Sequence, residues 1–392
     1  MTPRDEHGAA RPEPGSGRLR YIDALRGIAA LLVLWLHVAN SFRAVSPQTA
    51  SNVRWLNDFI TEIDIGRLGV VVFFLISGFV IPFSIRSGSG APIGSFVIRR
   101  ALRIYPAYWL SVPLAAWVFF WYVGAPFSGR ELFANFTLLQ SLFGVRHAEG
   151  VYWTLVVEIA FYALCIGLLL MRSLYSARRI AILCAALASM HVFAAFMLWL
   201  EHPVMDVAAS FWPLNLSVML WGALYRMEST SNDRFASAML RLLAAFYVLV
   251  LPIGAALATH ALQSYTISYA LAVVVFVLGT RVVRIETRLT DWLGRISYSI
   301  YLFHPIVFQP IYLWLMLQPV DSPWRTQHLA VYLVANLVLT LIAASLVFRF
   351  VEQPAIRLGH RLATRYEQNA SRKRPDIVAA ASSGIAGQPS AD

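Results

Sequence analysis

About ten stretches of roughly twenty mostly apolar residues follow one another along this chain, and each is long enough to cross a bilayer as a helix. They cover residues 22–42, 66–86, 104–124, 151–171, 179–200, 208–227, 239–258, 263–280, 297–317 and 329–350. With 58% hydrophobic residues and a mean hydropathy of +0.61, the chain has more apolar surface than a soluble domain can bury. The sequence therefore predicts an all-α, polytopic membrane protein.

The basic residues predict the direction of these helices. Alternate connecting segments, both termini included, hold 25 of the 32 lysines and arginines, whereas the other connecting segments hold 6. Cytoplasmic segments carry the excess of positive charge in membrane proteins. We therefore expect both termini in the cytoplasm and the chain in the inner, or cytoplasmic, membrane. The net charge of +11 belongs to these short segments and does not indicate nucleic-acid binding.

The predicted organisation is a single membrane domain with short tails. Residues 1–20 are expected to form a polar cytoplasmic tail, 21–358 the transmembrane domain, and 359–392 a largely disordered cytoplasmic tail. Residues 131–143 are too short and polar to span, which favours an interfacial or re-entrant segment. Both cysteines fall in apolar stretches, so we expect no disulfide and no metal site.

Two ionisable residues lie in the first apolar stretch, LRGIAALLVLWLHV. Arg26 and His37 are eleven positions apart, which brings them within ~20° on one helix face and ~16 Å apart along the axis. Ionisable residues inside membrane helices usually serve function. The alternatives are an arginine that extends to the interface and a histidine bonded to a neighbouring helix.

An arginine cluster precedes the third stretch, in FVIRRALRIYPAYW. Arg100 and Arg103 share a helix face, and guanidinium groups suit phosphates. A topology determinant of positive charge is the alternative for the whole cluster, which includes Arg99.

Other polar side chains fall within apolar stretches. Glu158 lies two turns into the fourth stretch and needs a cationic or hydrogen-bonding partner, for which His37, Arg26 or a substrate are candidates. Ser77 and Gly78 lie within the second stretch, where small residues favour close helix packing.

The stretch ISYSIYLFHP places three polar side chains along one helix face. Ser297, Tyr301 and His304 are separated by four and three positions. Pro305 has no N–H, so it frees the carbonyl of Tyr301 and is expected to kink the helix. His304 is either a second functional histidine or a structural one.

Six segments in this order resemble the acyltransferase-three family of membrane O-acyltransferases. They are YIDALRGIAALLVLWLHV, FFLISGFVI, RRALRIYPAYW, YWTLVVEIAFY, ISYSIYLFHP and FVEQP, and they extend over residues 21–358. The family's arginine–ten residues–histidine pattern corresponds to Arg26 and His37 here. Its Arg-x-x-Arg pattern corresponds to Arg100 and Arg103.

The resemblance implies transfer of an acyl group, commonly acetyl from acetyl-CoA, to a hydroxyl of a carbohydrate or glycolipid at or beyond the cytoplasmic membrane. Arg26, Arg100 and Arg103 would hold coenzyme A phosphates as the donor binds, and no permanently bound cofactor is expected. His37, with Glu158, would act as general base or would carry the acyl group itself, and both routes stay open. Ser77, Tyr301 and His304 are further candidates to line the pore.

Several alternatives remain at the level of the sequence. Some members of the family modify small molecules such as antibiotics, and many carry a fused extracytoplasmic hydrolase-like domain. No such domain is recognisable here, so a separate extracytoplasmic partner protein is one expectation. A glycolipid transporter would also bury Arg, Glu and His, although the sequence has no inverted repeat that would favour it.

Overall fold

In the computed structural model, all regular secondary structure of the described residues is helical, and none of these residues forms a strand. The described residues are 19–45, 63–85, 91–200, 202, 207–230, 234–251 and 260–372. The helices are α1 (Arg20–Phe42), α4 (Ile65–Val80), α5 (Pro92–Val123), α6 (Gly129–Thr137), α7 (Trp153–Leu170), α8 (Ala177–Trp199), α9 (Val207–Thr230), α10 (Arg234–Ala245), α12 (His260–Val277), α13 (Arg288–Met316), α14 (Leu329–Val347) and α15 (Gln353–Arg372). This confirms the predicted all-α class.

Within the described residues, seven helical segments are long and apolar enough to cross a membrane. They are Arg20–Phe42, Ile65–Ser84, Pro92–Trp121, Gly150–Leu170, Ala177–Met197, Arg288–Met316 and Leu329–Arg372. A shorter apolar helix covers Thr266–Val282. The protein is therefore a multi-pass membrane protein, while the count of ten spans and the cytoplasmic location of both termini stay predictions.

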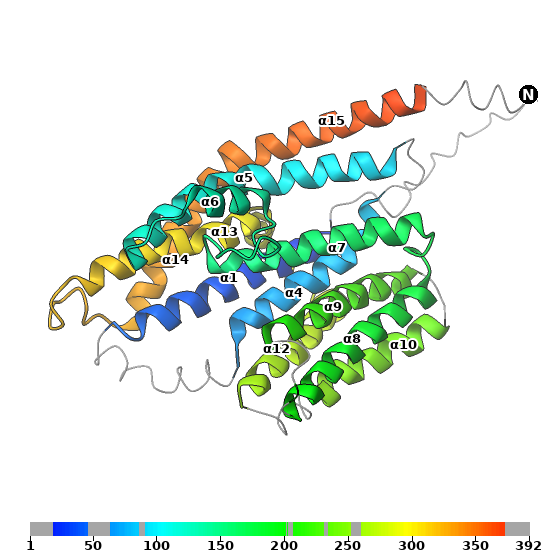
Figure 1. The fold of residues 1–392 in the computed structure, drawn as a ribbon, viewed down its shortest axis with the longest axis horizontal. Helices are drawn as coiled ribbons and strands as arrows, with labels where there is room; N and C mark the ends of the chain where they lie inside the picture. The colour runs from blue at the N-terminus through cyan, green and yellow to red at the C-terminus, as the bar shows by residue number, and fades with distance from the viewer. Residues whose placement is uncertain are drawn as a thin grey trace, which may run out of the picture.

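Helices α1 and α4 lie at the centre of the helical bundle (Figure 1). Helix α13 packs along one side of α1, with α5, α14 and α15 beyond it, and α9 packs along α4 on the other side, next to α8, α10 and α12. Every polar side chain that α1 or α4 turns inward therefore faces other helices rather than lipid. This central position explains why polar residues in these two helices are tolerated.

Small residues allow these central helices to approach closely. A Cβ atom added to Gly78 in α4 would overlap the backbone of Met219 in α9, and one added to Gly222 would overlap the carbonyl of Leu75. A side chain on Gly294 of α13 would likewise collide with the backbone of Asp23 in α1. The close-packing role expected for Gly78 is thus present, and it holds α4 against α9.

Helix α6 and the turn that follows fold back along α5. Three side chains of α5 donate hydrogen bonds to α6 carbonyls: Tyr105 to Thr137 at 3.0 Å, Tyr108 to Asn135 at 2.6 Å and Trp109 to Phe136 at 3.0 Å. Since Val123 ends α5, the chain has returned about 27 Å along that helix by the time it reaches the level of Tyr105. This is the segment that the sequence indicates to be interfacial or re-entrant.

The C-terminal helix extends past the expected end of the membrane domain. Helix α15 continues to Arg372 and packs along the first turns of α5, where Arg99 and Glu367 form a salt bridge of 3.1 Å. Residues 359–372, expected to belong to a largely disordered tail, are thus helical. The expected tails at 1–18 and 373–392 lie outside the described residues.

Candidate active site

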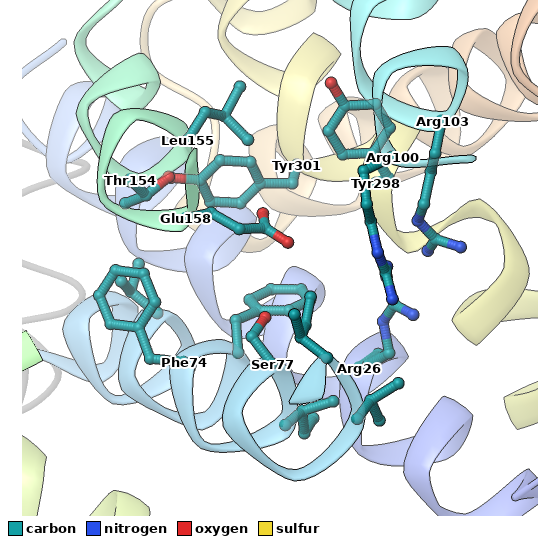
Figure 2. Close-up of a pocket in the computed structure, with 15 residues that line it drawn as sticks. Arg26, Phe74, Ser77, Arg100, Arg103, Thr154, Leu155, Glu158, Tyr298 and Tyr301 are labelled. Carbon is teal, nitrogen blue, oxygen red and sulfur yellow. The ribbon is translucent and has the colours of Figure 1, made fainter. Parts of the chain in front are cut away.

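Three arginines converge on one cavity between α1, α4, α5, α7 and α13 (Figure 2). Arg26 reaches it from the second turn of α1, and Arg100 and Arg103 reach it from α5. The cavity encloses about 700 Å³ of empty space, which includes its open mouth. Ser77, Glu158 and Tyr301 also line it, so six residues selected from the sequence come together here.

The arginine cavity has an excess of positive charge. Arg26 and Arg103 make no hydrogen bond or salt bridge with any residue that the structure describes, whereas Arg100 donates to the Ser84 hydroxyl at 2.7 Å. The one carboxylate lining the cavity is Glu158, which reaches in opposite the guanidinium groups (Figure 2). Two net positive charges and free guanidinium donors suit a multiply charged anion such as a phosphate.

Two carboxylates influence this cavity in different ways. Glu158 accepts a hydrogen bond of 2.6 Å from the Tyr162 hydroxyl and lies on the arginine side, away from the residues that line the His37 cavity. Glu352 is buried at the end of the π-helical segment Phe348–Glu352, which joins α14 and α15. It accepts a hydrogen bond of 2.7 Å from Ser299 and interacts electrostatically with Arg103 and Arg26. Glu352 does not line the cavity, and it stabilises the positive charge of Arg103 and Arg26 from outside it.

His37 lines a second cavity, with about 460 Å³ of empty space, at the opposite ends of α1 and α4. This His37 cavity lies where α1 ends and where α4 and α7 begin. Asp64 caps α4 by accepting from the backbone N–H of Arg67 at 2.8 Å, and the two side chains form a salt bridge of 3.2 Å. Trp153, the first residue of α7, contributes an aromatic side chain to the wall.

The two cavities meet at Val70 and Tyr301, which line both. The Tyr301 hydroxyl lies 2.7 Å from the Thr154 hydroxyl and donates to the Val151 carbonyl at 3.0 Å, so its ring is fixed against the start of α7. Arg26 and His37 do share a face of α1, as their spacing predicts. They nevertheless open into separate cavities, because residues from α4 and α13 lie between them.

A second imidazole contacts His37. Nε2 of His304 lies 3.1 Å from Nδ1 of His37, and the ring centroids are 5.0 Å apart. His304 is fully buried and lines neither cavity, in contrast to the expectation that it might line a pore. Its contact with the predicted catalytic histidine still brings it into the site.

One carboxyl group beside the His37 cavity has a raised pKa. Glu149 precedes Gly150, which lines that cavity, and accepts hydrogen bonds from the Gly150 N–H at 2.8 Å and from the Gln309 amide at 3.1 Å. Burial raises the pKa of Glu149 from 4.5 to about 7, against the lowering effect of those two donors. By accepting the hydrogen bond from Gln309, the Glu149 carboxyl group links the segment just before α7 to α13.

Sequence reasoning missed four residues of this region: Asp64, Arg67, Trp153 and Glu352. All four lie at the ends of helices, where charged and aromatic residues are ordinary in membrane proteins. Glu352 belongs to the segment FVEQP, but its sequence context predicts no role for this side chain. Among the described residues, no group of three His, Cys, Asp or Glu side chains is arranged to hold a metal ion.

Comparisons with known proteins identify a family for the chain. A family model described as an acyltransferase domain matches residues 19–349. The chain is 29% identical over 244 residues to nodulation protein 10 of Rhizobium leguminosarum bv. viciae, covering 56% of this chain and 62% of that protein. It therefore spans about three fifths of the length of that relative.

Two further relatives are matched over more of their length. A putative acetyltransferase, ORF330, of Acidianus two-tailed virus is 24% identical, with 72% of this chain and 81% of that protein covered. A putative membrane-bound transacylase, BcsY, of Komagataeibacter xylinus is 27% identical, with 73% and 72% covered. No solved structure matches.

The family model covers most of the chain and extends over both cavities, the arginine cluster and the histidine pair. With its helical membrane architecture, the chain therefore belongs to the acyltransferase-three family and is a membrane O-acyltransferase.

Proposed function

We propose that this enzyme transfers an acyl group, acetyl in the first instance, from cytoplasmic acyl-CoA to a hydroxyl of a cell-surface or lipid-linked carbohydrate. The observation that carries the proposal is the pair of cavities that meet at Tyr301 and Val70. One cavity suits an anionic donor and the other holds an imidazole. In the orientation predicted from the basic residues, the arginine cavity faces the cytoplasm of a cell whose inner membrane holds the enzyme.

The donor would bind with its phosphates against the arginines. Arg26, Arg100 and Arg103 supply charge-assisted hydrogen bonds that a coenzyme A phosphate group accepts. The pantetheine arm then extends past Ser77 toward Tyr301, so that the thioester reaches the boundary between the cavities. Glu158 lies along this path and offers its carboxylate to polar groups of the arm.

The acceptor would enter the His37 cavity from the extracytoplasmic side. Asp64 and Arg67 together carry no net charge, and they offer acceptors and donors that suit the hydroxyl groups of a sugar. Trp153 adds an apolar face against which a sugar ring can pack. These features support a carbohydrate rather than a strongly anionic acceptor.

His37 would carry out the proton transfer. The acceptor oxygen bonds to the acyl carbon while its proton moves to Nε2 of His37, the C–S bond breaks, and the proton passes on to the coenzyme A sulfur. In the second route, Nε2 attacks the thioester first, the C–S bond breaks and coenzyme A leaves as the thiolate; the acceptor oxygen then bonds to the acyl carbon, the N–C bond breaks, and the hydroxyl proton passes to the coenzyme A sulfur. Both routes need an unprotonated Nε2 within the cavity.

Labelled acetyl-CoA and a glycolipid extract of the host membrane provide the test. Purified enzyme in proteoliposomes should release free coenzyme A and place the label in an alkali-labile ester on carbohydrate. A glycolipid transporter would move the lipid without consuming acetyl-CoA. Absence of coenzyme A release in the presence of the extract would contradict the proposal.

Two cysteine variants test the sidedness of the cavities, because Cys165 and Cys184 are both buried and give little background. Ser77→Cys should react with an impermeant maleimide added from the cytoplasmic side, and acetyl-CoA should protect it. Leu36→Cys, in the His37 cavity, should react from the extracytoplasmic side without protection by acetyl-CoA. Labelling of both from one side would contradict the opposed arrangement.

A further inference from the structure

The contact between His37 and His304 fixes the positions of their protons. Nδ1 of His304 lies 2.8 Å from the Tyr301 carbonyl and 3.2 Å from the Ile300 carbonyl. A carbonyl oxygen accepts only, so Nδ1 of His304 carries the hydrogen. Neutral His304 therefore presents the lone pair of Nε2, and this lone pair points at Nδ1 of His37.

The same reasoning shows which ring nitrogen of His37 carries the hydrogen. Its Nδ1 lies 3.0 Å from the Val33 carbonyl, one turn earlier in α1, so Nδ1 carries a hydrogen that Val33 and His304 share. The lone pair of His37 is then on Nε2. This nitrogen has no hydrogen-bond partner among the described residues, and it belongs to a side chain that lines the His37 cavity.

Pro305 explains why the His304 ring is held in this orientation. In an α-helix the N–H of residue 305 would bond to the carbonyl of Tyr301, but proline has no N–H. The carbonyl of Tyr301 is thereby left open, and Nδ1 of His304 takes it. Because Pro305 leaves the Tyr301 carbonyl without a backbone donor, the hydrogen bond from Nδ1 to that carbonyl holds the His304 ring in one orientation.

Neither imidazole is hydrogen-bonded to a carboxylate in the part of the chain that the structure describes. We infer that His304 is a positioning residue, whose lone pair accepts from Nδ1 of His37 and stabilises the positive charge that His37 acquires when Nε2 takes a proton or an acyl group. His304 does this as a neutral ring and undergoes no covalent change. The inference rests on the proposed function, since it assigns His304 a role only if His37 reacts.

Three variants of His304 separate this role from packing. In His304→Gln the side-chain carbonyl reaches the position of Nε2 and keeps an acceptor for His37. His304→Asn keeps only the polar group near Nδ1, and His304→Leu fills the space without any acceptor. A packing role would make leucine the best replacement, because the site is fully buried. The hydrogen-bonding role makes glutamine the best.

The expected result is a loss of about 10–100-fold in kcat for His304→Asn and His304→Leu, as for loss of a hydrogen bond to a charged group. His304→Gln should stay within about threefold of the wild type. KM for acetyl-CoA should not change in any of the three, because His304 lies outside the arginine cavity. Equal kcat values for glutamine and leucine would overturn the inference.

Pro305→Ala keeps both imidazoles and supplies the missing N–H, so it tests the inference even if the His304 variants fold poorly. The alanine N–H should compete with Nδ1 of His304 for the Tyr301 carbonyl. This competition should free the His304 ring and lower kcat about 3–10-fold without changing KM for acetyl-CoA. A wild-type kcat would overturn the role of Pro305. His37→Gln is the reference: if it is inactive while the His304 and Pro305 variants match the wild type, the proposed function survives and the inference fails.

Discussion

The two cavities are built largely from opposite ends of α1 and α4, and they balance charge in opposite ways. Three arginines and one carboxylate line the first cavity, and two of these arginines have no hydrogen-bond or salt-bridge partner among the described residues. In the second cavity, Arg67 is paired with Asp64, and the remaining ionisable side chains are the His37 imidazole and the Tyr301 phenol.

This contrast indicates what each cavity is adapted to bind. Arginine without a partner is costly inside a membrane protein, so a cluster of such arginines is expected where a ligand supplies the negative charge. A salt bridge that is already formed has no such requirement, and it favours a neutral ligand. In the proposed reaction, this separation would let the donor and the acceptor meet where the cavities share Val70 and Tyr301.

The largest effect is expected from His37→Gln. Loss of a catalytic base typically lowers the rate about 10²–10⁴-fold, and glutamine keeps the size and polarity of the side chain. Acetyl-CoA binding should persist, because His37 does not line the arginine cavity. Turnover of labelled acetyl-CoA and equilibrium binding measure the two properties separately.

His191→Gln is the matched control, since His191 is a buried histidine in α8 that lines neither cavity. It should retain turnover. Near-normal turnover in His37→Gln, together with loss of turnover in His304→Gln, would show that the wrong histidine was assigned.

Arg100→Ala and Arg103→Ala should each weaken acetyl-CoA binding by about 1.5–3 kcal/mol, or roughly 10–150-fold, through loss of charge-assisted hydrogen bonds. The natural control is Arg99→Ala. Arg99 belongs to the same cluster in the sequence but pairs with Glu367 of α15 and does not line the cavity. Unchanged acetyl-CoA affinity in both Arg100→Ala and Arg103→Ala would indicate that the cluster determines topology only.

The sequence predicts the all-α membrane class and selects the three arginines that line one cavity, because both inferences depend on local patterns. An apolar stretch containing an isolated arginine or histidine stands out against its neighbours, and helical spacing places Arg26 and His37 on one face. The same reasoning could not separate the two residues into different cavities. That division depends on Val70 and Tyr301, which come from other helices.

The stripe of Ser297, Tyr301 and His304 illustrates the same limit. Spacing places these residues on one face of α13, but this face meets three partners: Ser297 bonds within its own helix, Tyr301 meets α7, and His304 meets α1. Sequence periodicity gives the direction of a side chain and not the helix that it meets. The roles of Asp64 and Trp153 depend on such contacts as well.

Trp153→Ala should raise the acceptor KM about 5–30-fold, as expected for loss of about 1–2 kcal/mol of aromatic contact, and leave the KM for acetyl-CoA unchanged. Trp153→Phe should recover most of the acceptor affinity. Trp117→Ala is the control, since Trp117 is 59% exposed on α5 and lines neither cavity. If Trp153→Ala changed donor affinity instead, the division of the two substrates between the cavities would be wrong.

The smallest effect concerns Glu149 and is a change in stability with pH. Because burial raises its pKa to about 7, the folded protein binds a proton that the unfolded chain releases above its ordinary pKa of 4.5. The stability contributed by this proton is complete below pH 4.5 and is lost as the pH rises through about 7. Between pH 5 and pH 8, the wild type should therefore lose about 2–3 kcal/mol relative to Glu149→Gln, measured by denaturant or thermal unfolding in detergent.

Glu131 provides a control of opposite sign. The Ser128 N–H and the Arg146 guanidinium lower its pKa, so its contribution is present at neutral pH and is lost as the pH falls through the lowered value. Glu131→Gln should accordingly leave the loss between pH 5 and pH 8 in place, whereas Glu149→Gln should remove it. A wild-type profile in Glu149→Gln would mean that this carboxyl group is ionised in the folded protein at neutral pH, and the joint between α7 and α13 beside the His37 cavity would then carry a negative charge.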